Sequence, residues 1–228
     1  MDSNFISTSI EPELIAGWLR TRCVARGLPP PLADHGGWRV DTKQPNELRR
    51  YLFARAGEGL RVLAETIDTP RIFLKLCGSE QEMRALLTPR WQLDEPRFVM
   101  TGDEFAARVT PLAPGYSLQL TSMGPLTTAR ILTSRGELAA SGQAAESQGF
   151  FIYDQISTAP EHRRRGLAAH LMQALRAARK SSAATQFLDA NVDGQKLYSS
   201  LGRRTRSPRR SGRRPPSDNQ SGESGRQS

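Results

Sequence analysis

A net charge of +9 on 228 residues, with 37% apolar and 24% charged side chains, is the composition of a globular protein large enough to bury a core. No apolar run approaches the ~20 residues that a membrane-spanning helix requires, so we expect no membrane partner. Two Cys and three His residues are too few for a disulfide framework or a Cys-based metal site. The first residues lack a basic region followed by an apolar run, so we expect no signal peptide and a reducing, cytoplasmic setting.

Hydrophobic periodicity and turn residues predict short helices and strands in the first hundred residues, after a segment, 1–10, that we expect to be disordered. These elements are a helix over 14–24, a strand over 36–40, a helix that Asn46 caps and that runs through Leu52, a strand over 71–76, a helix that a Ser79 and Glu82 capping box opens, and a strand over 97–100.

Part of this first region is similar to a later part of the chain. An offset of 114 residues aligns Phe73 and Leu74 with Phe187 and Leu188. Two interpretations stay open. Residues 11–101 form an N-terminal α/β region that is a degenerate half-copy of the later strand and helix unit, or two such pieces resemble each other by chance. In either case the region carries no chemical motif of its own.

Residues 102–115 contain two prolines and predict an inter-domain linker. Three strands are expected after it, at 116–121, 126–133 and 138–145, separated by turn residues. They lead into a fourth run of β-branched and aromatic residues, 150–158. We therefore expect an antiparallel meander that ends in this last strand.

The turn after this strand carries the most informative pattern. It follows Pro160 and precedes a helix predicted over 164–179, and it contains Arg163, Gly166 and Ala168 in the pattern R-x-x-G-x-A. A strand–turn–helix unit directs the first N–H groups of the helix, and its positive dipole end, beyond the strand. Because glycine lets an anion approach the backbone, the turn favours a phosphate or pyrophosphate.

This pattern resembles motif A of the GNAT superfamily of N-acetyltransferases, in which the turn binds the pyrophosphate of acetyl-CoA. A second motif supports the resemblance. A strand predicted over 184–190 is followed by residues 191–202, which are similar to the superfamily's closing helix, N-x-x-A-x-x-L-Y-x-x-L-G-F. The matching residues are Asn191, Leu197, Tyr198, Leu201 and Gly202, with Gly194 in place of Ala. Taken singly, the Arg cluster could be a solvated helix start and Tyr198 a packing residue. Two motifs in the right order favour the functional interpretation, which covers about residues 115–202.

The resemblance implies an α/β (α+β) fold, with a mixed, mostly antiparallel sheet and flanking helices. An acetyl-CoA-binding domain over 116–202 would follow the smaller N-terminal region. The implied activity is that of an N-acetyltransferase, which moves the acetyl group of acetyl-CoA to a primary amine by direct transfer. The expected partners are acetyl-CoA and an amine acceptor, either a small molecule or a protein amine, and a homodimer is compatible with this family. No motif identifies the acceptor.

The resemblance also assigns roles to residues. Backbone groups at the strand end are expected to hold the pantetheine arm, and those of the turn the pyrophosphate. The expected cofactor-binding residues are Ile156, Ser157, Thr158, Arg163, Arg164, Arg165, Gly166, Leu167, Ala168 and Asn191. Tyr198 is expected to supply a proton to the departing thiolate, and Asp154 to accept the proton of the amine, with Glu146 in reserve.

The C-terminal tail departs most from the family pattern. After Gly202, eight Arg stand against two carboxylates, and we expect residues 203–228 to be a basic, disordered tail. Family members carry further strands here, so we expect the strand 184–190 to lack its usual neighbours and activity to be impaired. Two alternatives therefore stay open: a non-catalytic or impaired acyl-CoA-binding relative, and an unspecific nucleic-acid binder that uses the Arg-rich tail.

Overall fold

The computed structural model describes residues 10–102 and 111–215, and the strands within these ranges form one twelve-stranded sheet. The segment 1–9 and most of the predicted linker lie outside the described residues, as does the end of the tail. The N-terminal half contains α1 (Pro12–Ala25), β1 (Leu32–Asp34), β2 (Gly37–Gln44), β3 (Glu47–Phe53), α2 (Glu58–Thr66), β4 (Ile72–Cys77), α3 (Glu80–Leu86), β5 (Gln92–Leu93) and β6 (Arg97–Thr101). The C-terminal half contains β7 (Tyr116–Met123), β8 (Leu126–Thr133), β9 (Leu138–Ser147), β10 (Phe150–Thr158), the 3-10 turn Pro160–His162, α4 (Leu167–Ala177), β11 (Thr185–Ala190), α5 (Val192–Ser200) and β12 (Arg204–Arg213).

The C-terminal half has the predicted meander and crossover. β7 to β10 pair antiparallel in chain order, α4 crosses over, and β11 returns parallel to β10. The N-terminal half repeats this order, since β1 to β3 pair antiparallel, α2 crosses over, and β4 returns parallel to β3. The expected mixed, mostly antiparallel sheet with flanking helices is therefore confirmed.

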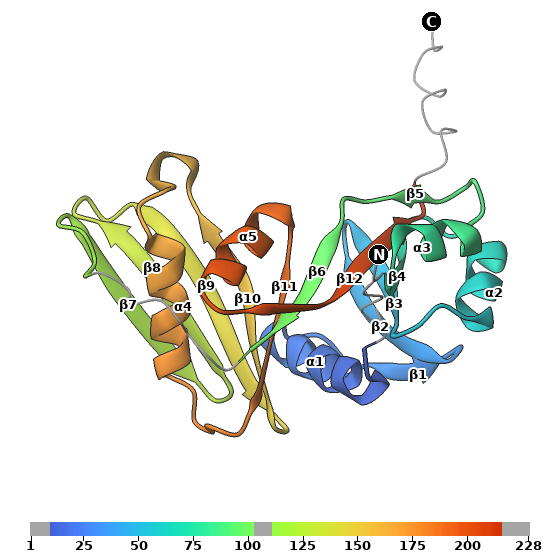
Figure 1. The fold of residues 1–228 in the computed structure, drawn as a ribbon, viewed down its shortest axis with the longest axis horizontal. Helices are drawn as coiled ribbons and strands as arrows, with labels where there is room; N and C mark the ends of the chain where they lie inside the picture. The colour runs from blue at the N-terminus through green and yellow to red at the C-terminus, as the bar shows by residue number, and fades with distance from the viewer. Residues whose placement is uncertain (1–9, 103–110, 216–228) are drawn as a thin grey trace, which may run out of the picture.

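The two halves share the centre of the sheet. β6 follows the helices of the N-terminal half but pairs with β11, and β12 follows α5 but pairs with β4. β6 and β12 also pair with each other, so the sheet runs without a break from one half to the other (Figure 1). Each half thus supplies the strand that completes the sheet of the other.

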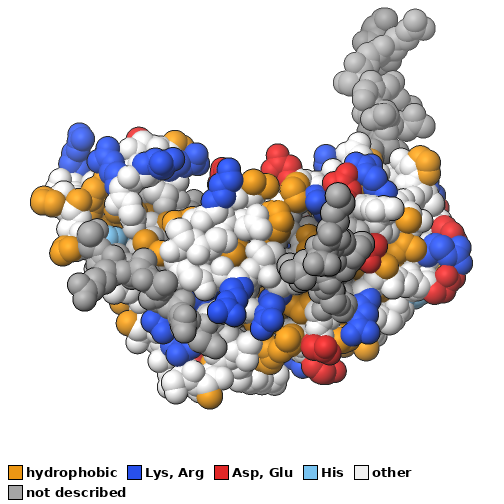
Figure 2. Space-filling model, in the orientation of Figure 1, with side chains coloured by type: hydrophobic (Ala, Val, Ile, Leu, Met, Phe, Trp, Pro, Cys, Tyr) orange, Lys and Arg blue, Asp and Glu red, His pale blue; other side chains and the backbone are white. Residues whose placement is uncertain are grey.

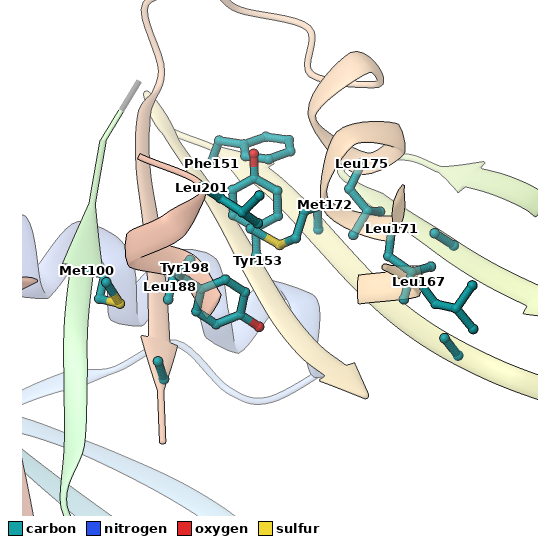
Figure 3. Close-up of a cluster of buried hydrophobic side chains, with 14 of the residues drawn as sticks. Met100, Phe151, Tyr153, Leu167, Leu171, Met172, Leu175, Leu188, Tyr198 and Leu201 are labelled. Atoms are coloured by element: carbon teal, nitrogen blue, oxygen red, sulfur yellow. The ribbon is translucent and has the colours of Figure 1, made fainter. Parts of the chain in front are cut away.

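Buried side chains alternate along β10 between two cores. Phe151 and Tyr153 belong to the core beneath α4 and α5, shown in Figure 3, whereas Ile152 belongs to the core beneath α1. β3 behaves likewise, with Tyr51 in the core beneath α2 and α3 and Leu52 in the core beneath α1. The four later helices therefore cover one face of the sheet, and α1 covers the other.

The predicted helix after Asn46 is wrong, because this segment is β3. Its last residues are buried on both faces of the sheet, so the alternation typical of a strand is lost. Apolar residues at Leu48, Tyr51 and Leu52 then match helical spacing equally well. The capping box at Ser79 and Glu82 is confirmed at the start of α3.

The predicted disorder of the tail is wrong for its first part, because residues 204–213 form β12 in the centre of the sheet. Arg209 is only 3% exposed and donates hydrogen bonds to both carboxylate oxygens of Asp189. Arg210 pairs with Glu80, and Arg213 with Asp94. The expectation that β11 lacks a neighbour is also wrong, since β6 pairs with it.

Candidate functional site

The strands β10 and β11 separate where the candidate site begins. Their parallel ladder runs from Phe150 opposite Thr185 to Tyr153 opposite Leu188 and ends there. β10 then bulges between Asp154 and Ser157 while it stays paired with β9. Because a bulge bends its strand, the last residues of β10 diverge from β11 and turn backbone groups toward the gap.

A groove with a cavity of about 910 Å³ lies at this separation, between the end of β10, the start of α4 and the helix α5. The predicted residues that line it are Ile156, Ser157, Thr158, Arg163, Arg164, Gly166, Leu167, Ala168, Asn191 and Tyr198. The structure thus brings together all the predicted cofactor-binding residues except Arg165.

The turn before α4 presents the end of a helix to this groove. Gly166 is the N-cap and has a φ of 74°, a left-handed conformation that favours glycine. No side chain caps α4, and its first turn has no acidic residue. The first N–H groups of α4 are therefore available to an anion, and the helix dipole favours one there. Figure 2 shows Lys and Arg side chains along the upper edge of the molecule, in the region of this turn.

The side chain of Arg165 contacts residues outside the groove. Its guanidinium donates to Tyr116 Oη at 2.9 Å and to the carbonyl oxygen of Glu161 at 3.4 Å. Tyr116 Oη also lies 2.9 Å from His162 Nδ1. Arg165 therefore ties the turn to β7 instead of lining the groove.

Tyr198 lies where the groove meets a smaller cavity of about 200 Å³, and it lines both. The side chain comes from α5, and its ring lies beside Leu188 with the hydroxyl directed away from Met100 (Figure 3). Burial raises the pKa of Tyr198 to about 12, although the positive charge of Arg97 opposes this shift. The phenol is therefore protonated at neutral pH and can act as a proton donor.

Asp154 lines the smaller cavity but is fully engaged. Arg26 Nε and Nη2 donate to its two oxygens at 2.6 and 2.8 Å, and Arg22 lies beside it. Burial alone would raise the pKa of Asp154, but the hydrogen bonds from Arg26 and the charge of Arg22 outweigh it and lower the pKa. Such a carboxylate is a weak base. Glu146 lies elsewhere, where it accepts hydrogen bonds from the backbone N–H groups of Lys180 and Ser181.

Sequence reasoning missed a second buried carboxylate at this site. Asp189 accepts hydrogen bonds from Arg22, Arg97 and Arg209, which come from α1, β6 and β12. Burial would raise its pKa, but the charges of these arginines lower it strongly. The available signal was a lone carboxylate within the apolar run of β11.

Two negative findings hold for the described ranges, 10–102 and 111–215. None of their helices is long and apolar enough to cross a membrane. Their His, Cys, Asp and Glu side chains form no group of three or more that could hold a metal ion.

Comparison with known proteins agrees with this geometry. Residues 129–202 match the family model of an acetyltransferase (GNAT) domain. Among solved structures, a GCN5-related N-acetyltransferase from Kribbella flavida is similar with a TM-score of 0.62 and 12% identity, over 91% of this chain and 97% of that one. A GCN5-related N-acetyltransferase-like protein from Streptococcus suis is similar with a TM-score of 0.55 and 12% identity, over 78% and 83% of the two chains. A functionally unknown conserved protein from Staphylococcus epidermidis is similar with a TM-score of 0.59 and 8% identity, over 81% and 93%. No curated protein matches the chain significantly.

Proposed function

Since this chain belongs to the GNAT superfamily of acetyltransferases, we propose that it moves the acetyl group of acetyl-CoA to a primary amine by direct transfer. The observation that carries the proposal is the separation of β10 from β11 in front of the uncapped start of α4. This arrangement combines unpaired strand backbone with a helix N-terminus at one groove. Those are the groups that an extended pantetheine arm and a pyrophosphate require.

The residues present fit acetyl-CoA. Gly166 has no side chain, and a Cβ built there would meet only His170 Nδ1 at 4.0 Å, so the space in front of the turn is open. Arg163 and Arg164 line the groove and add positive charge beside the helix end. When bound, acetyl-CoA supplies an activated thioester, whose carbonyl carbon accepts the amine nitrogen as its bond to sulfur breaks.

Tyr198 then acts as the general acid. Its protonated hydroxyl lies at the junction of the groove and the smaller cavity, where donor and acceptor must meet. It donates its proton to the departing sulfur and recovers one from solvent. A positioned proton donor typically contributes about 10² to 10⁴-fold to such a rate.

The amine proton leaves to water in this proposal. The carboxylates that line the smaller cavity, Asp154 and Asp189, are both held by arginines and have lowered pKa values, so neither suits the capture of a proton from an ammonium group. We propose that Asp154 is a positioning residue, which orients Arg26. The acceptor therefore reacts in its neutral form.

The tail arginines give no support to the nucleic-acid alternative. Arg209, Arg210 and Arg213 are paired with carboxylates within the fold, and Arg214 lies near Asp68. These ion pairs offset part of the positive charge that unspecific phosphate binding requires. A cytoplasmic setting and a homodimer stay predictions.

The proposal is tested by thiol release from acetyl-CoA with a panel of primary amines, together with calorimetric titration of acetyl-CoA and desulfo-CoA. We expect both nucleotides to bind and thiol release to require an amine. Binding without release from any amine would favour a non-catalytic acyl-CoA-binding relative. Absence of binding to a folded protein would overturn the proposal.

The role of Asp154 is tested by the pH profile of Asp154→Asn. If the amine loses its proton to water, kcat/KM should rise with pH up to the ammonium pKa of the acceptor in wild type and variant alike. We expect the variant to raise the KM of the acceptor, because Arg26 is no longer oriented. A rising limb that disappears in the variant would instead identify Asp154 as the general base.

A further inference from the structure

The smaller cavity beside Tyr198 has a neighbour, and the two cavities share two lining side chains. Arg26 and Arg97 line this cavity, and both also line a neighbouring cavity of about 260 Å³. A molecule in the cavity beside Tyr198 is therefore in a space that these two arginines also line. The volumes of about 200 and 260 Å³ are small relative to drug-sized pockets, which are roughly 300–1,000 Å³, and suit a small acceptor.

Positive charge exceeds negative charge around these two cavities. Asp154 and Asp189 are the two carboxylates of the first cavity, and four guanidinium groups surround them, which leaves a formal excess of two positive charges. These groups belong to Arg22, Arg26, Arg97 and Arg209. The second cavity is lined by six cationic and three acidic side chains: Arg22, Arg26, Arg50, Lys75, Arg97 and Arg209 against Glu47, Asp94 and Glu95.

The cationic side chains are also more exposed to a ligand than the carboxylates are. The side chains of Asp154 and Asp189 are 8% and 6% exposed, whereas those of Arg26 and Arg97 are 25% and 38% exposed. The carboxylates are thus covered, and the guanidinium groups form the accessible part of each pair.

Hydrogen bonds to Asp154 and Asp189 hold Arg26 and Arg97 in place and leave some of their N–H donors unused. Arg97 donates from Nε and Nη2 to the side chain and the backbone of Asp189, and Arg26 donates from Nε and Nη2 to Asp154. Within the described part of the chain, the Nη1 of neither arginine donates a hydrogen bond. A guanidinium held in this way loses little freedom when it binds an oxyanion.

Arg97 is also near the proposed general acid, since its charge lowers the pKa of Tyr198 against the effect of burial. In the second cavity, burial and the charge of Arg50 hold the pKa of Lys75 well below its usual value. An anion bound there would offset the repulsion among these cations. Arg97 and Tyr198 both line the smaller cavity, so an anionic group held by Arg97 shares that cavity with the proposed general acid.

We propose that the acceptor is a small amine that carries an oxyanion, a carboxylate or a phosphate, which binds between Arg26 and Arg97 while the amine reaches Tyr198. This inference rests on the proposed function. Arg26 and Arg97 are then specificity-determining residues, contributed by α1 and β6 of the N-terminal half. The N-terminal half thus selects the acceptor, and the C-terminal half holds the acetyl donor.

The test compares matched amines that differ in the oxyanion. β-Alanine is paired with propylamine and O-phosphoethanolamine with ethanolamine, and thiol release from acetyl-CoA is measured for each. We expect turnover with at least one anionic amine and little with its uncharged counterpart. Which anionic amine is preferred distinguishes a carboxylate from a phosphate.

Arg97→Gln should raise the KM of the anionic amine about tenfold or more, because a hydrogen bond to a charged group is lost, and should leave the KM of acetyl-CoA unchanged. Asp189 keeps Arg22 and Arg209, which favours folding of the variant. If that variant fails to fold, Arg97→Lys keeps a positive charge near Asp189 but loses the forked donor, and should also raise this KM. Arg39→Gln is the control, since Arg39 has similar exposure at 29% and pairs with Asp34 on the distant β1.

The outcomes separate the inference from the proposed function. Equal turnover of the uncharged amines, or an unchanged KM in both Arg97 variants, would overturn the anionic acceptor while the transferase activity stands. If no amine is turned over, calorimetry of β-alanine and O-phosphoethanolamine decides: Arg97-dependent binding of either one supports the inference, and binding of neither refutes it. Titration of acetyl-CoA in the same experiment then shows whether the proposed function has failed as well.

Discussion

The two halves of the molecule share a topology but differ at one point of the sheet. Tyr51 lies opposite Leu74 in the N-terminal half, and Tyr153 lies opposite Leu188 in the C-terminal half. In the N-terminal half the parallel ladder continues to Phe53, whereas in the C-terminal half it ends at Tyr153 and β10 bulges away. Two further residue pairs therefore close the gap that forms the groove in the other half.

The connections that follow β3 and β10 also differ, and only the one after β10 leaves room for an anion. Residues 54–57 join β3 directly to α2, whereas 159–166 form the longer basic turn before α4. The first turn of α2 carries Glu58, and a Cβ at Gly59 would lie 1.8 Å from the carbonyl oxygen of His35. Negative charge and packed backbone thus occupy the place where an anion would bind. The comparison supports the proposal that the N-terminal region is a degenerate half of the GNAT type, which keeps the fold without the donor site.

β6 pairs with a strand of the C-terminal half and β12 with a strand of the N-terminal half, and we call this arrangement the exchange of β6 and β12. Because it makes the two halves depend on each other for stability, removing β12 should destabilise the fold more than any other change proposed here. A chain that ends at Gly202 leaves β4, β5 and β6 without their shared partner and Asp189 without Arg209. We expect loss of the cooperative thermal transition in calorimetry. A chain that ends at Pro215 keeps all of β12 and is the control. If the shorter chain also unfolded cooperatively at an unchanged temperature, the exchange would not matter for stability.

A single substitution tests one contact of β12, the ion pair between Arg209 and Asp189. Arg209→Ala removes one partner of the buried Asp189 and should lower the free energy of unfolding by about 3 kcal/mol. Arg210→Ala is the matched control, because Arg210 pairs with the more exposed Glu80 and should cost about 1 kcal/mol or less. Equal losses in urea denaturation would contradict this account.

The pH dependence of stability should follow from Asp189. Because its pKa in the folded state is lowered, its contribution to stability is present above the unfolded pKa of about 4 and is lost as the pH falls below that value toward the folded pKa. Wild type should therefore lose stability steeply below about pH 4, and Arg209→Ala less steeply. A parallel decline in both proteins would show that other carboxylates dominate.

Tyr198→Phe tests whether the general acid comes from the C-terminal half. The substitution keeps the ring and removes the proton, so kcat should fall about a hundredfold with little change in acetyl-CoA affinity. The 114-residue offset places Arg84 of α3 at the corresponding position, and Arg84→Ala should leave kcat unchanged. Wild-type turnover in Tyr198→Phe would make this residue a packing residue.

Local motifs made much of the C-terminal half predictable. The strand 150–158 matches β10, and the helix predicted over 164–179 is α4, although it begins only at Leu167, after the N-cap Gly166. The offset of 114 is compatible with the repeated order of strands in the two halves, and a half-copy stays a prediction. These features depend on neighbours in the chain, which a sequence displays directly.

The remaining features depend on partners that are far apart in the chain. β12 pairs with β4 and β6, and its arginines pair with Asp189 and Glu80, partners that composition alone cannot show. β3 is buried on both faces and so loses its alternation. The proposed acceptor site joins Arg26 and Arg97 from different elements, and no local spacing indicates it.

The central claim is that only the C-terminal half binds the acetyl donor, and calorimetric titration of acetyl-CoA tests it most directly. We expect one site per chain, an affinity about thirtyfold weaker in Gly166→Asp, which is about 2 kcal/mol, and wild-type affinity in Gly57→Asp at the start of α2. Gly149→Asp controls for backbone strain, because Gly149 has a similar φ of 77° on the β9–β10 turn, at the opposite end of β10 from the groove. Two sites per chain, or a loss in Gly57→Asp as large as in a folded Gly166→Asp, would contradict the account.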